Sequence, residues 1–347
     1  MSENKSSLIL GLAAGAGALA VLTALSRAGR RYDVARKVVL ITGGSRGLGL
    51  VMAREFAARG ARLAIVARDA GELSRAKSDL ESMGAEVFAA VCDMTDQSEV
   101  ESMVSEVGSA LGPVDILVNN AGVIQVGPLK VQTQQDFETA MQIHFWAPFY
   151  AMQAVLPEMR RRQDGRIINI SSIGGKVAVP HLAPYCASKF ALSGLSSSMR
   201  TELVKENILL TTVYPGLMRT GSHINASFKG QNEKEFALFS LMNGLPLTSI
   251  SAENAATQIV NATERGDAEL VVSVQAKIAA KMFALFPQFT SDILALTDRF
   301  LPEEGGIGRG YATGLESTSG VSPSWLTSLL DSASRRNNEL KPNESIN

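Results

Sequence analysis

Short apolar runs alternate with longer stretches of helical periodicity from about residue 36 to residue 273. Apolar runs of this length, bounded by turn residues, are typical of strands buried on both faces. Repeated strand–helix units predict an α/β fold with a doubly wound parallel sheet. The expected strands are Lys37–Ile41, Arg62–Ala67, Val87–Cys92, Val114–Asn119, Arg166–Ser171, Leu209–Tyr214 and Ala268–Ser273.

The longest helical stretches are Gln134–Arg162 and Tyr185–Glu206. After the last expected strand, Val274–Leu301 carries an apolar stripe with Lys277 and Lys281 at its start. This pattern suits either a helix pair that covers a substrate pocket or a pair that lies on a membrane surface. From residue 302 onward the chain is rich in Gly, Ser, Pro and Asn, which predicts a loose tail.

We therefore expect four segments. Residues 1–34 form an N-terminal apolar segment, 35–275 a single α/β domain, 276–310 an amphipathic helical extension and 311–347 a flexible polar tail. The 347 residues are enough for two domains, but the continuous strand–helix alternation favours one.

The N-terminal segment contains an uncharged run, Leu8–Leu25, that is just long enough to cross a bilayer. Glu3 and Lys5 offset each other before the run, whereas five basic residues lie between Arg27 and Lys37 after it, which places the following domain on the cytoplasmic side by the positive-inside rule. The expected location is therefore a membrane with the domain facing the cytoplasm. A signal peptide, or an Ala/Gly-rich helix that packs on protein in a cytoplasmic protein, remains the alternative.

Composition excludes several other classes of function. The 33 basic and 34 acidic residues balance, so nothing indicates a nucleic-acid partner. Cys92 and Cys186 are the only cysteines, which suits a reduced, cytosol-facing protein. The three histidines, His144, His181 and His223, are scattered, and no Cys/His group has the spacing of metal ligands.

A glycine-rich turn follows the first expected strand and precedes a helical stretch. It reads Thr42, Gly43, Gly44, Ser45, Arg46, Gly47, Leu48 and Gly49. Glycines let the backbone approach a pyrophosphate, and the helix N-terminus offers unpaired N–H groups and a positive dipole end. The segment therefore predicts a phosphate cradle.

The T-G-x-x-x-G-x-G spacing resembles that of the short-chain dehydrogenase/reductase family. Four further motifs occur in the family's order: Asp93, Asn119–Gly122, Ser172 with Tyr185–Lys189, and Pro215-Gly216. The resemblance covers about Arg36 to Ser273. It implies a Rossmann fold, a nicotinamide cofactor, and a dimer or tetramer formed through the two long helices.

Tyr185 and Lys189 are four residues apart on one helix face. A tyrosine loses its proton near pH 10, and a nearby ammonium lowers that pKa, so the pair can act as an acid/base in carbonyl–alcohol interconversion. By resemblance, Lys189 also binds the nicotinamide ribose. Ser172 would hydrogen-bond the substrate oxygen; Ser171 competes for this role, but the family's spacing favours Ser172.

The end of the second strand bears on cofactor choice. Ala67 stands where NAD-preferring relatives carry an acid, and Arg68 and Arg46 suit a 2′-phosphate, so NADP(H) is expected. Asp69 is the NAD-favouring alternative. The resemblance implies cofactor contacts from Thr42, Gly43, Gly44, Ser45, Arg46, Gly47, Leu48, Gly49, Arg68, Asp93, Met94, Asn120, Ala121, Gly122, Tyr185, Lys189, Pro215, Gly216, Met218 and Thr220.

The sequence departs from the family at one catalytic position. An asparagine usually lies in the long helix before Ser172, and the alignment puts His144 there. A neutral imidazole has one donor and one acceptor, so His144 either replaces the asparagine in a water-linked proton relay or is a packed core residue.

The predicted function is NADP(H)-dependent interconversion of a carbonyl and an alcohol on an apolar, lipid-like substrate, with Tyr185 as the acid/base. Pro180–Pro184, Gly221–Leu247 and the C-terminal helices are expected to form the pocket. The alternatives are an NAD-dependent alcohol dehydrogenase of the same family and a non-catalytic NADPH-binding membrane scaffold.

Overall fold

A computed structural model describes residues 31–320, 322–324, 327–341 and 344, together with Gly15 and Gly17. The expected membrane run Leu8–Leu25 therefore lies outside the described residues, apart from those two glycines. Among the helices that are described, none is both long enough and apolar enough to cross a membrane.

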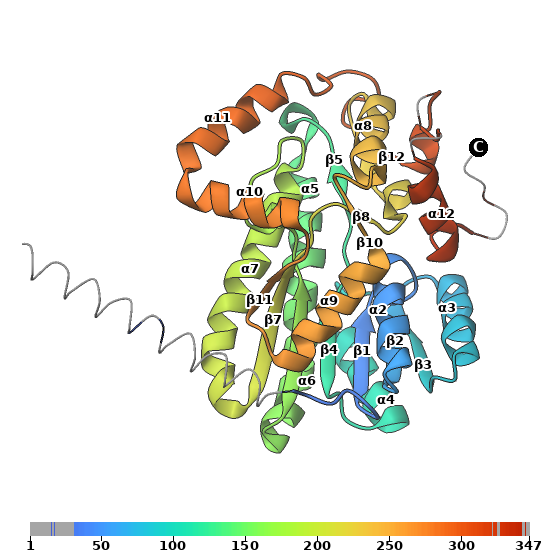
Figure 1. Cartoon of the computed structure of the whole chain (residues 1–347). Helices are drawn as coiled ribbons and strands as arrows, with labels where there is room; N and C mark the ends of the chain where they lie inside the picture. The colour runs from blue at the N-terminus through green and yellow to red at the C-terminus, as the bar shows by residue number, and fades with distance from the viewer. Residues whose placement is uncertain are drawn as a thin grey trace, which may run out of the picture.

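A parallel sheet in the order β11-β7-β6-β4-β1-β2-β3 forms the centre of the molecule (Figure 1). The chain places β2 and β3 on one side of β1 and the later strands on the other, so the strand order reverses between β1 and β4. Ligands of doubly wound sheets bind at such a switch point. The strands are β1 Val38–Thr42, β2 Arg62–Ala67, β3 Val87–Val91, β4 Ile116–Asn119, β6 Gly165–Ile170, β7 Ile208–Tyr214 and β11 Glu269–Val271. All expected strands are confirmed, with ends that differ by at most two residues.

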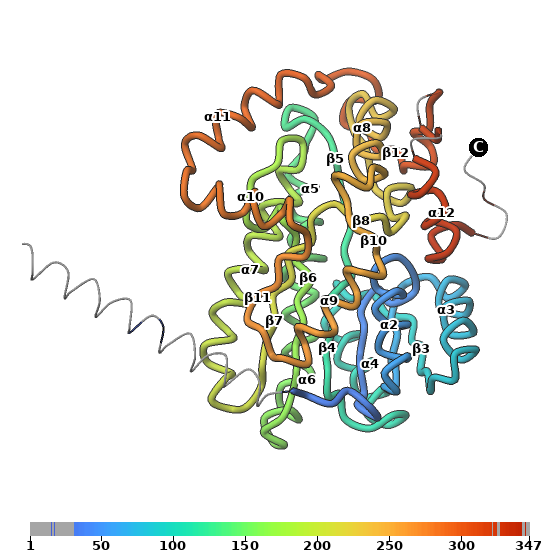
Figure 2. Tube along the Cα trace, in the orientation of Figure 1, coloured from blue at the N-terminus to red at the C-terminus, as the bar shows by residue number. Residues whose placement is uncertain are grey.

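Helices cover both faces of the sheet, and each face has its own apolar core (Figure 2). On one face the helices are α2 Gly47–Ala58, α3 Ala70–Ser82 and α9 Ala252–Arg265; Met52, Phe56 and Ile259 lie in this core. On the other face the helices are α4 Gln97–Leu111, α6 Ala147–Arg162 and α7 Ala183–Leu203, with Met103 and Met152 in the core. Burial on both faces explains why the strands read as unbroken apolar runs.

The expected helix Gln134–Arg162 is continuous but changes geometry in its middle. It begins as α5 Gln134–Met141, passes through a π-helical turn, η2 Gln142–Trp146, and continues as α6. π-helical turns occur often at functional sites. Here the turn carries His144, which is buried between the loop after β4 and α7.

Small elements build the wall above the carboxyl ends of the sheet. β5 Gln125–Val126, β9 Ser227–Phe228 and β12 Ala312–Thr313 form one short sheet, and β8 Met218–Arg219 pairs with β10 Ile250–Ser251. Helix α8 Asn232–Gly244 packs Phe236 against Phe228 between them. Short helical turns complete the loops: η1 Leu129–Val131, η3 Ile173–Gly175, η4 Val204–Glu206, η5 Ser222–Asn225 and η6 Leu315–Ser317.

The C-terminal region departs from its prediction. The expected helix pair is present as α10 Val274–Leu285 and α11 Pro287–Asp298. The prediction of a loose tail, however, is wrong for the described residues that follow. Helix α12 Ser328–Arg336 buries Leu330 and Ala333 and packs beside α8 (Figure 1). The composition misled the prediction because this segment is fixed by contacts with residues far away in the chain rather than by a local apolar pattern.

Candidate active site

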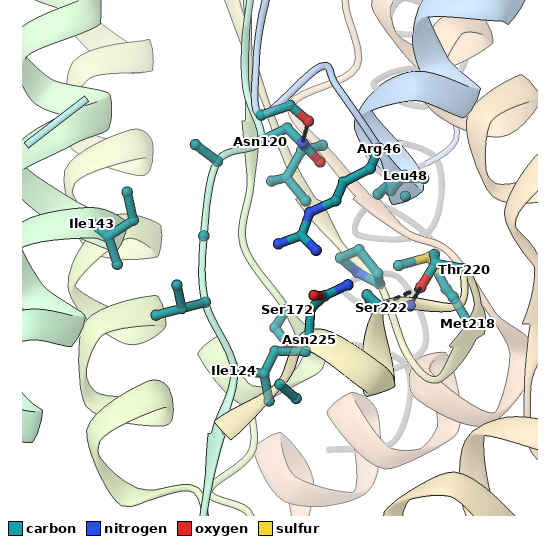
Figure 3. A pocket seen from close by; sticks show the side chains of 18 of the residues that line it. Arg46, Leu48, Asn120, Ile124, Ile143, Ser172, Met218, Thr220, Ser222 and Asn225 are labelled. Carbon is teal, nitrogen blue, oxygen red and sulfur yellow. Dashed lines mark hydrogen bonds between the residues drawn. The ribbon is translucent and has the colours of Figure 1, made fainter. Parts of the chain in front are cut away.

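A cavity of about 490 Å³ lies at the carboxyl ends of the strands, at the switch point. Its volume is within the range of small-molecule and cofactor sites. The loops after β1, β2, β3, β4, β6 and β7 all contribute to its walls, together with η5, α8 and α12. Figure 3 shows the Arg46 side chain reaching into this space from the glycine turn, opposite Asn225.

The glycine turn supplies one end of the cavity through Gly43, Ser45, Arg46, Gly47 and Leu48. Gly47 is the first residue of α2 and has a φ of 55°, a conformation that favours glycine. The turn therefore has the phosphate-cradle geometry expected from the sequence.

Three residues predicted to contact the cofactor do not line the cavity: Thr42, Gly44 and Gly49. In this structure they contact other parts of the protein. A Cβ on Gly44 would lie 2.9 Å from the Ile65 side chain, and a Cβ on Gly49 would overlap the carbonyl oxygen of Gly43. Both glycines let α2 approach the sheet, and Thr42 anchors the neighbouring loop.

The loop after β4 is tied directly to the glycine turn. The Asn120 side chain donates to the carbonyl oxygens of Thr42 and Gly43, both at 3.0 Å. The Thr42 hydroxyl oxygen accepts from the backbone N–H groups of Asn120 and Ala121 at 3.0 and 3.1 Å. Asn120, Ala121 and Gly122 consequently line the cavity as predicted.

The end of the cavity beside β2 and β3 contains Arg68, Asp69, Asp93 and Met94. Arg68 is exposed on the wall. Asp69, the NAD-favouring alternative, already caps α3 by accepting from the backbone N–H of Glu72 at 2.9 Å. Asp93 similarly accepts from the backbone N–H of Thr95, which shapes the loop after β3.

Two carboxylates lie beside Arg46 in the cavity. Its Nε lies 3.5 Å from Glu72, and its Nη1 lies 3.2 Å from the carboxylate of Glu339. The sequence placed two guanidiniums and no carboxylate at this point, so Glu339 is a finding that local sequence reasoning missed. Arg46 is already paired with acids that a cofactor phosphate would have to replace.

The catalytic residues predicted from the sequence lie together on another wall of the cavity. Ser172 follows β6 and caps η3: its oxygen accepts from the backbone N–H of Gly174 at 3.0 Å, which leaves its hydroxyl hydrogen to donate. Tyr185 and Lys189 face it from α7, and the Lys189 ammonium nitrogen is 2.9 Å from the Ile170 carbonyl oxygen. Ser171, the competitor, instead contacts Ser193 and the Lys189 carbonyl within the core.

Burial, rather than the charge of Lys189, has the largest effect on the pKa values of Tyr185 and Lys189. Burial raises the pKa of Tyr185 to about 12, with the Ser172 side chain partly opposing it. Burial also lowers the pKa of Lys189 to about 7. The expectation that the ammonium lowers the tyrosine pKa is therefore not met in this form of the site, because desolvation disfavours both charged groups.

His144 is completely enclosed. Its Nε2 accepts from the backbone N–H of Val123 at 3.2 Å, so Nδ1 carries the hydrogen and faces the Ser188 hydroxyl at 2.8 Å. Its ring meets that of Tyr185 edge to face with centroids 5.2 Å apart. Burial, followed by the nearby Lys189 charge, holds its pKa well below the usual range.

Both ring nitrogens of His144 have protein partners, so neither is left to hold a relay water. This arrangement favours the packed alternative over the proton relay: His144 positions Tyr185 and the loop after β4. The lowered pKa also keeps the imidazole neutral near pH 7.

The remaining wall combines predicted and unpredicted residues. Pro215, Gly216, Met218 and Thr220 line the cavity as expected, and Leu182 comes from the predicted loop Pro180–Pro184. Ser222, His223, Asn225, Phe239 and Asn243 come from the predicted Gly221–Leu247 region, but Leu330 and Glu339 come from the supposed tail. None of the cavity's lining residues belongs to α10 or α11, so the prediction that these helices form the pocket is wrong.

Comparison with known proteins agrees with this geometry. The family model described as short chain dehydrogenase matches residues 37–229. The chain belongs to the short-chain dehydrogenase/reductase family, and it is an oxidoreductase of that class.

Among its relatives, a protein of Anopheles gambiae named dehydrogenase/reductase SDR family protein 7-like is 32% identical over 76% of this chain and 83% of its own length. Gluconate 5-dehydrogenase of Gluconobacter oxydans is 36% identical over 52% of this chain and 71% of its own length. Fatty acyl-CoA reductase of Acinetobacter baylyi is 35% identical over 55% of this chain and 65% of its own length.

Solved structures extend the agreement to the three-dimensional fold. A short-chain dehydrogenase from Streptomyces avermitilis aligns with a TM-score of 0.66 at 26% identity, over 78% of this chain and 99% of that one. A metagenomic short-chain oxidoreductase in complex with NADP aligns with a TM-score of 0.57 at 28% identity, over 70% and 98%.

The buried lysine should make stability depend on pH. An unfolded lysine titrates near pH 10.4 and the folded Lys189 near 7, so the unfolded state binds more protons between those values and stability rises with pH there. We expect cofactor-free Lys189→Met to be more stable than the unmodified protein at pH 7.5, with the gap in unfolding free energy shrinking by about 2–3 kcal/mol at pH 9.5.

Urea denaturation at the two pH values measures this gap. Lys277→Met, at an exposed position on α10, is the control and should show the same small difference at both. A gap for Lys189→Met that does not change with pH would contradict the assigned cause.

Proposed function

We propose that this protein is an NADP(H)-dependent oxidoreductase that interconverts a carbonyl and an alcohol on an apolar, lipid-like substrate. One observation carries the proposal: Ser172, Tyr185 and Lys189 line the same cavity that continues to the glycine turn at the start of α2. A donor, a proton-transfer group and a cation thus share a wall with a nucleotide-sized space.

The residues present fit a nicotinamide dinucleotide, because the cavity joins a phosphate cradle to a proton-transfer site. When bound, the nicotinamide supplies or accepts the hydride. In the reductive direction, Tyr185 transfers its phenolic proton to the carbonyl oxygen, and Ser172 donates a hydrogen bond to the same oxygen. Lys189, with a pKa of about 7, stabilises the resulting phenolate in its charged form.

The preference for NADP(H) is supported by the end of β2. Arg68 is exposed on the cavity wall, and the Asp69 carboxylate is engaged at the α3 N-terminus. A guanidinium at this point suits a 2′-phosphate. One structural relative is a complex with NADP. An NAD-dependent enzyme of the same family is the alternative.

Apolar residues in the cavity lining, beyond the wall formed by Ser172, Tyr185 and Lys189 (the catalytic wall), support an apolar substrate. Ile124, Val179, Leu182, Phe239 and Leu330 are among the residues that line the cavity. Such a surface desolvates a hydrocarbon and offers few partners to a sugar or another polar substrate. Fatty acyl-CoA reductase, a relative, is named for a lipid-like substrate, whereas gluconate 5-dehydrogenase, another relative, is named for a polar one.

We also propose a membrane location, with the catalytic domain facing the cytoplasm. The uncharged run Leu8–Leu25 is the first support. The second is the outer surface of α10 and α11, which we call the apolar ridge. None of the α11 residues is buried, and the large apolar side chains exposed on the ridge are Val274, Ile278, Leu285, Phe286, Phe289, Ile293 and Leu296. A patch of this kind suits the interfacial region of a bilayer.

Self-association through the long helices is part of the proposal. Trp146 on η2 and Phe190 on α7 are 39% and 41% exposed. Aromatic residues at such positions favour a homo-oligomeric interface.

Tyr185→Phe should abolish turnover, because it removes the transferable proton but little volume. NADPH affinity should change less than threefold. Turnover is measured with a panel of apolar ketones and NADPH consumption, and affinity by the quenching of protein fluorescence. Tyr311→Phe, whose ring is 72% exposed, is the control and should retain turnover. Normal turnover of Tyr185→Phe would refute the acid/base assignment; no turnover by the unmodified protein on any carbonyl would favour the scaffold alternative.

Cofactor preference should reverse in Ala67→Asp with Arg68→Leu. Each charge-assisted contact with a phosphate contributes roughly 1.5–3 kcal/mol, so the loss of Arg68 should weaken NADPH binding about tenfold or more. The added carboxylate should strengthen NADH binding by accepting from the ribose hydroxyls. Titration with both nucleotides measures the change. Equal NADPH and NADH affinities in the unmodified protein would argue against the proposal.

Membrane binding should have two separable parts. The full chain should remain in the membrane fraction after alkaline carbonate, and a chain lacking residues 1–30 should bind vesicles only weakly, through the apolar ridge. Phe286→Glu with Phe289→Glu in the shortened chain should abolish vesicle flotation, because two charges would enter the interface. Met83→Glu, at an exposed position after α3, is the control. A full chain found entirely in the soluble fraction would refute the anchor.

A further inference from the structure

The C-terminal segment Ser328–Glu339, which we call the C-terminal strap, crosses the phosphate end of the cavity. On the substrate side, the Ser334 hydroxyl donates to the Gly221 carbonyl at 3.1 Å, and the Asn337 side chain donates to the Thr220 carbonyl at 3.0 Å. On the other side, Arg54 of α2 donates to the Arg336 carbonyl at 2.9 Å. The strap thus joins the glycine turn to the loop after β7.

Two asparagines fix the end of the strap on the glycine turn. The Asn337 carbonyl oxygen accepts from the backbone N–H of Gly47, the first residue of α2, at 2.9 Å. Asn338 has a φ of 58°, and its side chain donates to the carbonyl oxygens of Ser45 and Glu72 at 2.8 and 3.0 Å. This left-handed turn, which asparagine tolerates well, directs the next residue into the cavity.

Glu339 ends this turn with its carboxylate inside the cavity. The side chain is 2% exposed, and its Oε2 lies 3.2 Å from Arg46 Nη1 and 2.8 Å from the Asn225 amide nitrogen. Its Oε1 is 2.5 Å from where a Cβ on Gly47 would be. Figure 3 shows Arg46 and Asn225, its two donors, on opposite walls of the cavity.

The strap therefore presents two acceptors to the groups that would bind a phosphate. A carbonyl oxygen takes the N-terminal N–H of α2, and a carboxylate takes the guanidinium beside it. These are the donors that a helix N-terminus and its flanking arginine offer to an anion.

We propose that Glu339 is a specificity-determining residue that competes with the 2′-phosphate of the cofactor for Arg46. This inference rests on the proposed NADP(H)-dependent function. Both nucleotides must displace the Asn337 carbonyl from the N–H of Gly47, so that contact does not discriminate between them. NADPH must in addition displace or neutralise the Glu339 carboxylate to reach the guanidinium of Arg46, whereas NADH has no 2′-phosphate and does not need Arg46. Glu339 thus reduces the advantage of NADPH over NADH.

The protonation of Glu339 makes this competition depend on pH. Burial raises the pKa of Glu339 to about 7, while Arg46 and the Asn225 amide oppose the rise and Glu72 adds to it. These are the charged and polar groups that face the carboxylate. The acid is therefore neutral below about pH 7 and charged above it, so Arg46 is freer at pH 7.0 than at pH 8.5.

The test measures the dissociation constants of NADPH and NADH at pH 7.0 and 8.5 in the full chain. The ratio of the two constants cancels the effect of Lys189, whose ribose contact the two nucleotides share. The proteins are the unmodified chain, Glu339→Gln, Arg46→Ala and the double variant. Glu344→Gln is the matched control, because that carboxylate lies five residues further on and, among the described residues, accepts from the Lys341 N–H rather than from a residue of the cavity.

We expect Glu339→Gln to tighten NADPH binding five- to tenfold at pH 8.5 and to change NADH binding less than twofold. In the unmodified chain the preference for NADPH should grow at least threefold from pH 8.5 to 7.0, and Glu339→Gln should remove that dependence. On the Arg46→Ala background, Glu339→Gln should have no effect on the ratio. Glu344→Gln should resemble the unmodified chain.

Weaker NADPH binding in Glu339→Gln, or an unchanged NADPH/NADH ratio, would overturn the proposal. If the variant does not fold, the unmodified chain still decides: a ratio that does not change between the two pH values overturns it. Failure of the proposed cofactor preference gives a different result, namely NADH binding at least as tightly as NADPH in both the unmodified chain and Glu339→Gln.

Discussion

The hydrogen bonds between Asn120 and the glycine turn join the loop after β4 to the loop after β1, and the rest of the site depends on this connection. Polar groups buried at the end of a sheet must be paired, and one amide here satisfies the carbonyl oxygens of both Thr42 and Gly43. The neighbouring Asn119 donates to Asn169 at 2.8 Å and so extends the connection to β6, the strand that leads to Ser172. The phosphate cradle and the catalytic wall are therefore positioned by one polar connection across β1, β4 and β6.

Two ionisable groups that line the cavity have pKa values near neutrality. One is a lysine whose pKa is lowered, and the other is a glutamate whose pKa is raised. Burial lowers the pKa of Lys189 to about 7 and raises that of Glu339 to about 7. Both are kept partly uncharged by the same cause, the removal of water from the cavity walls. Anionic ligands entering such a site would favour the charged lysine and the neutral acid together.

The sequence predicted the sheet well because parallel strands are buried on both faces, so runs such as Arg62–Ala67 carry their own signal. It also brought Ser172, Tyr185 and Lys189 together, since their spacing reflects the strand end and the helix that carry them. It could not separate the packing glycines Gly44 and Gly49 from the lining ones, because both kinds share one motif. That distinction depends on Ile65 and on the Gly43 carbonyl, which the motif does not specify.

The C-terminal strap was missed for a different reason. Asn337, Asn338 and Glu339 are polar and have no local periodicity, and their order comes from partners in the first quarter of the chain and in the loop after β7. For His144 the alignment predicted the position but left its role open. Its partners Val123 and Ser188 come from two different parts of the chain, which the local sequence does not reveal.

The strap also bears on the order in which the molecule forms. Arg46 and Glu339 are separated by 293 residues, so their contact closes a loop that includes most of the chain. During synthesis the strands of the sheet become available before Glu339, so the phosphate end of the cavity is completed after the sheet. The glycine turn is thus completed by a residue 293 positions further along, and a chain made only as far as the last strand of the sheet would have an open cradle beside a catalytic wall that is already built.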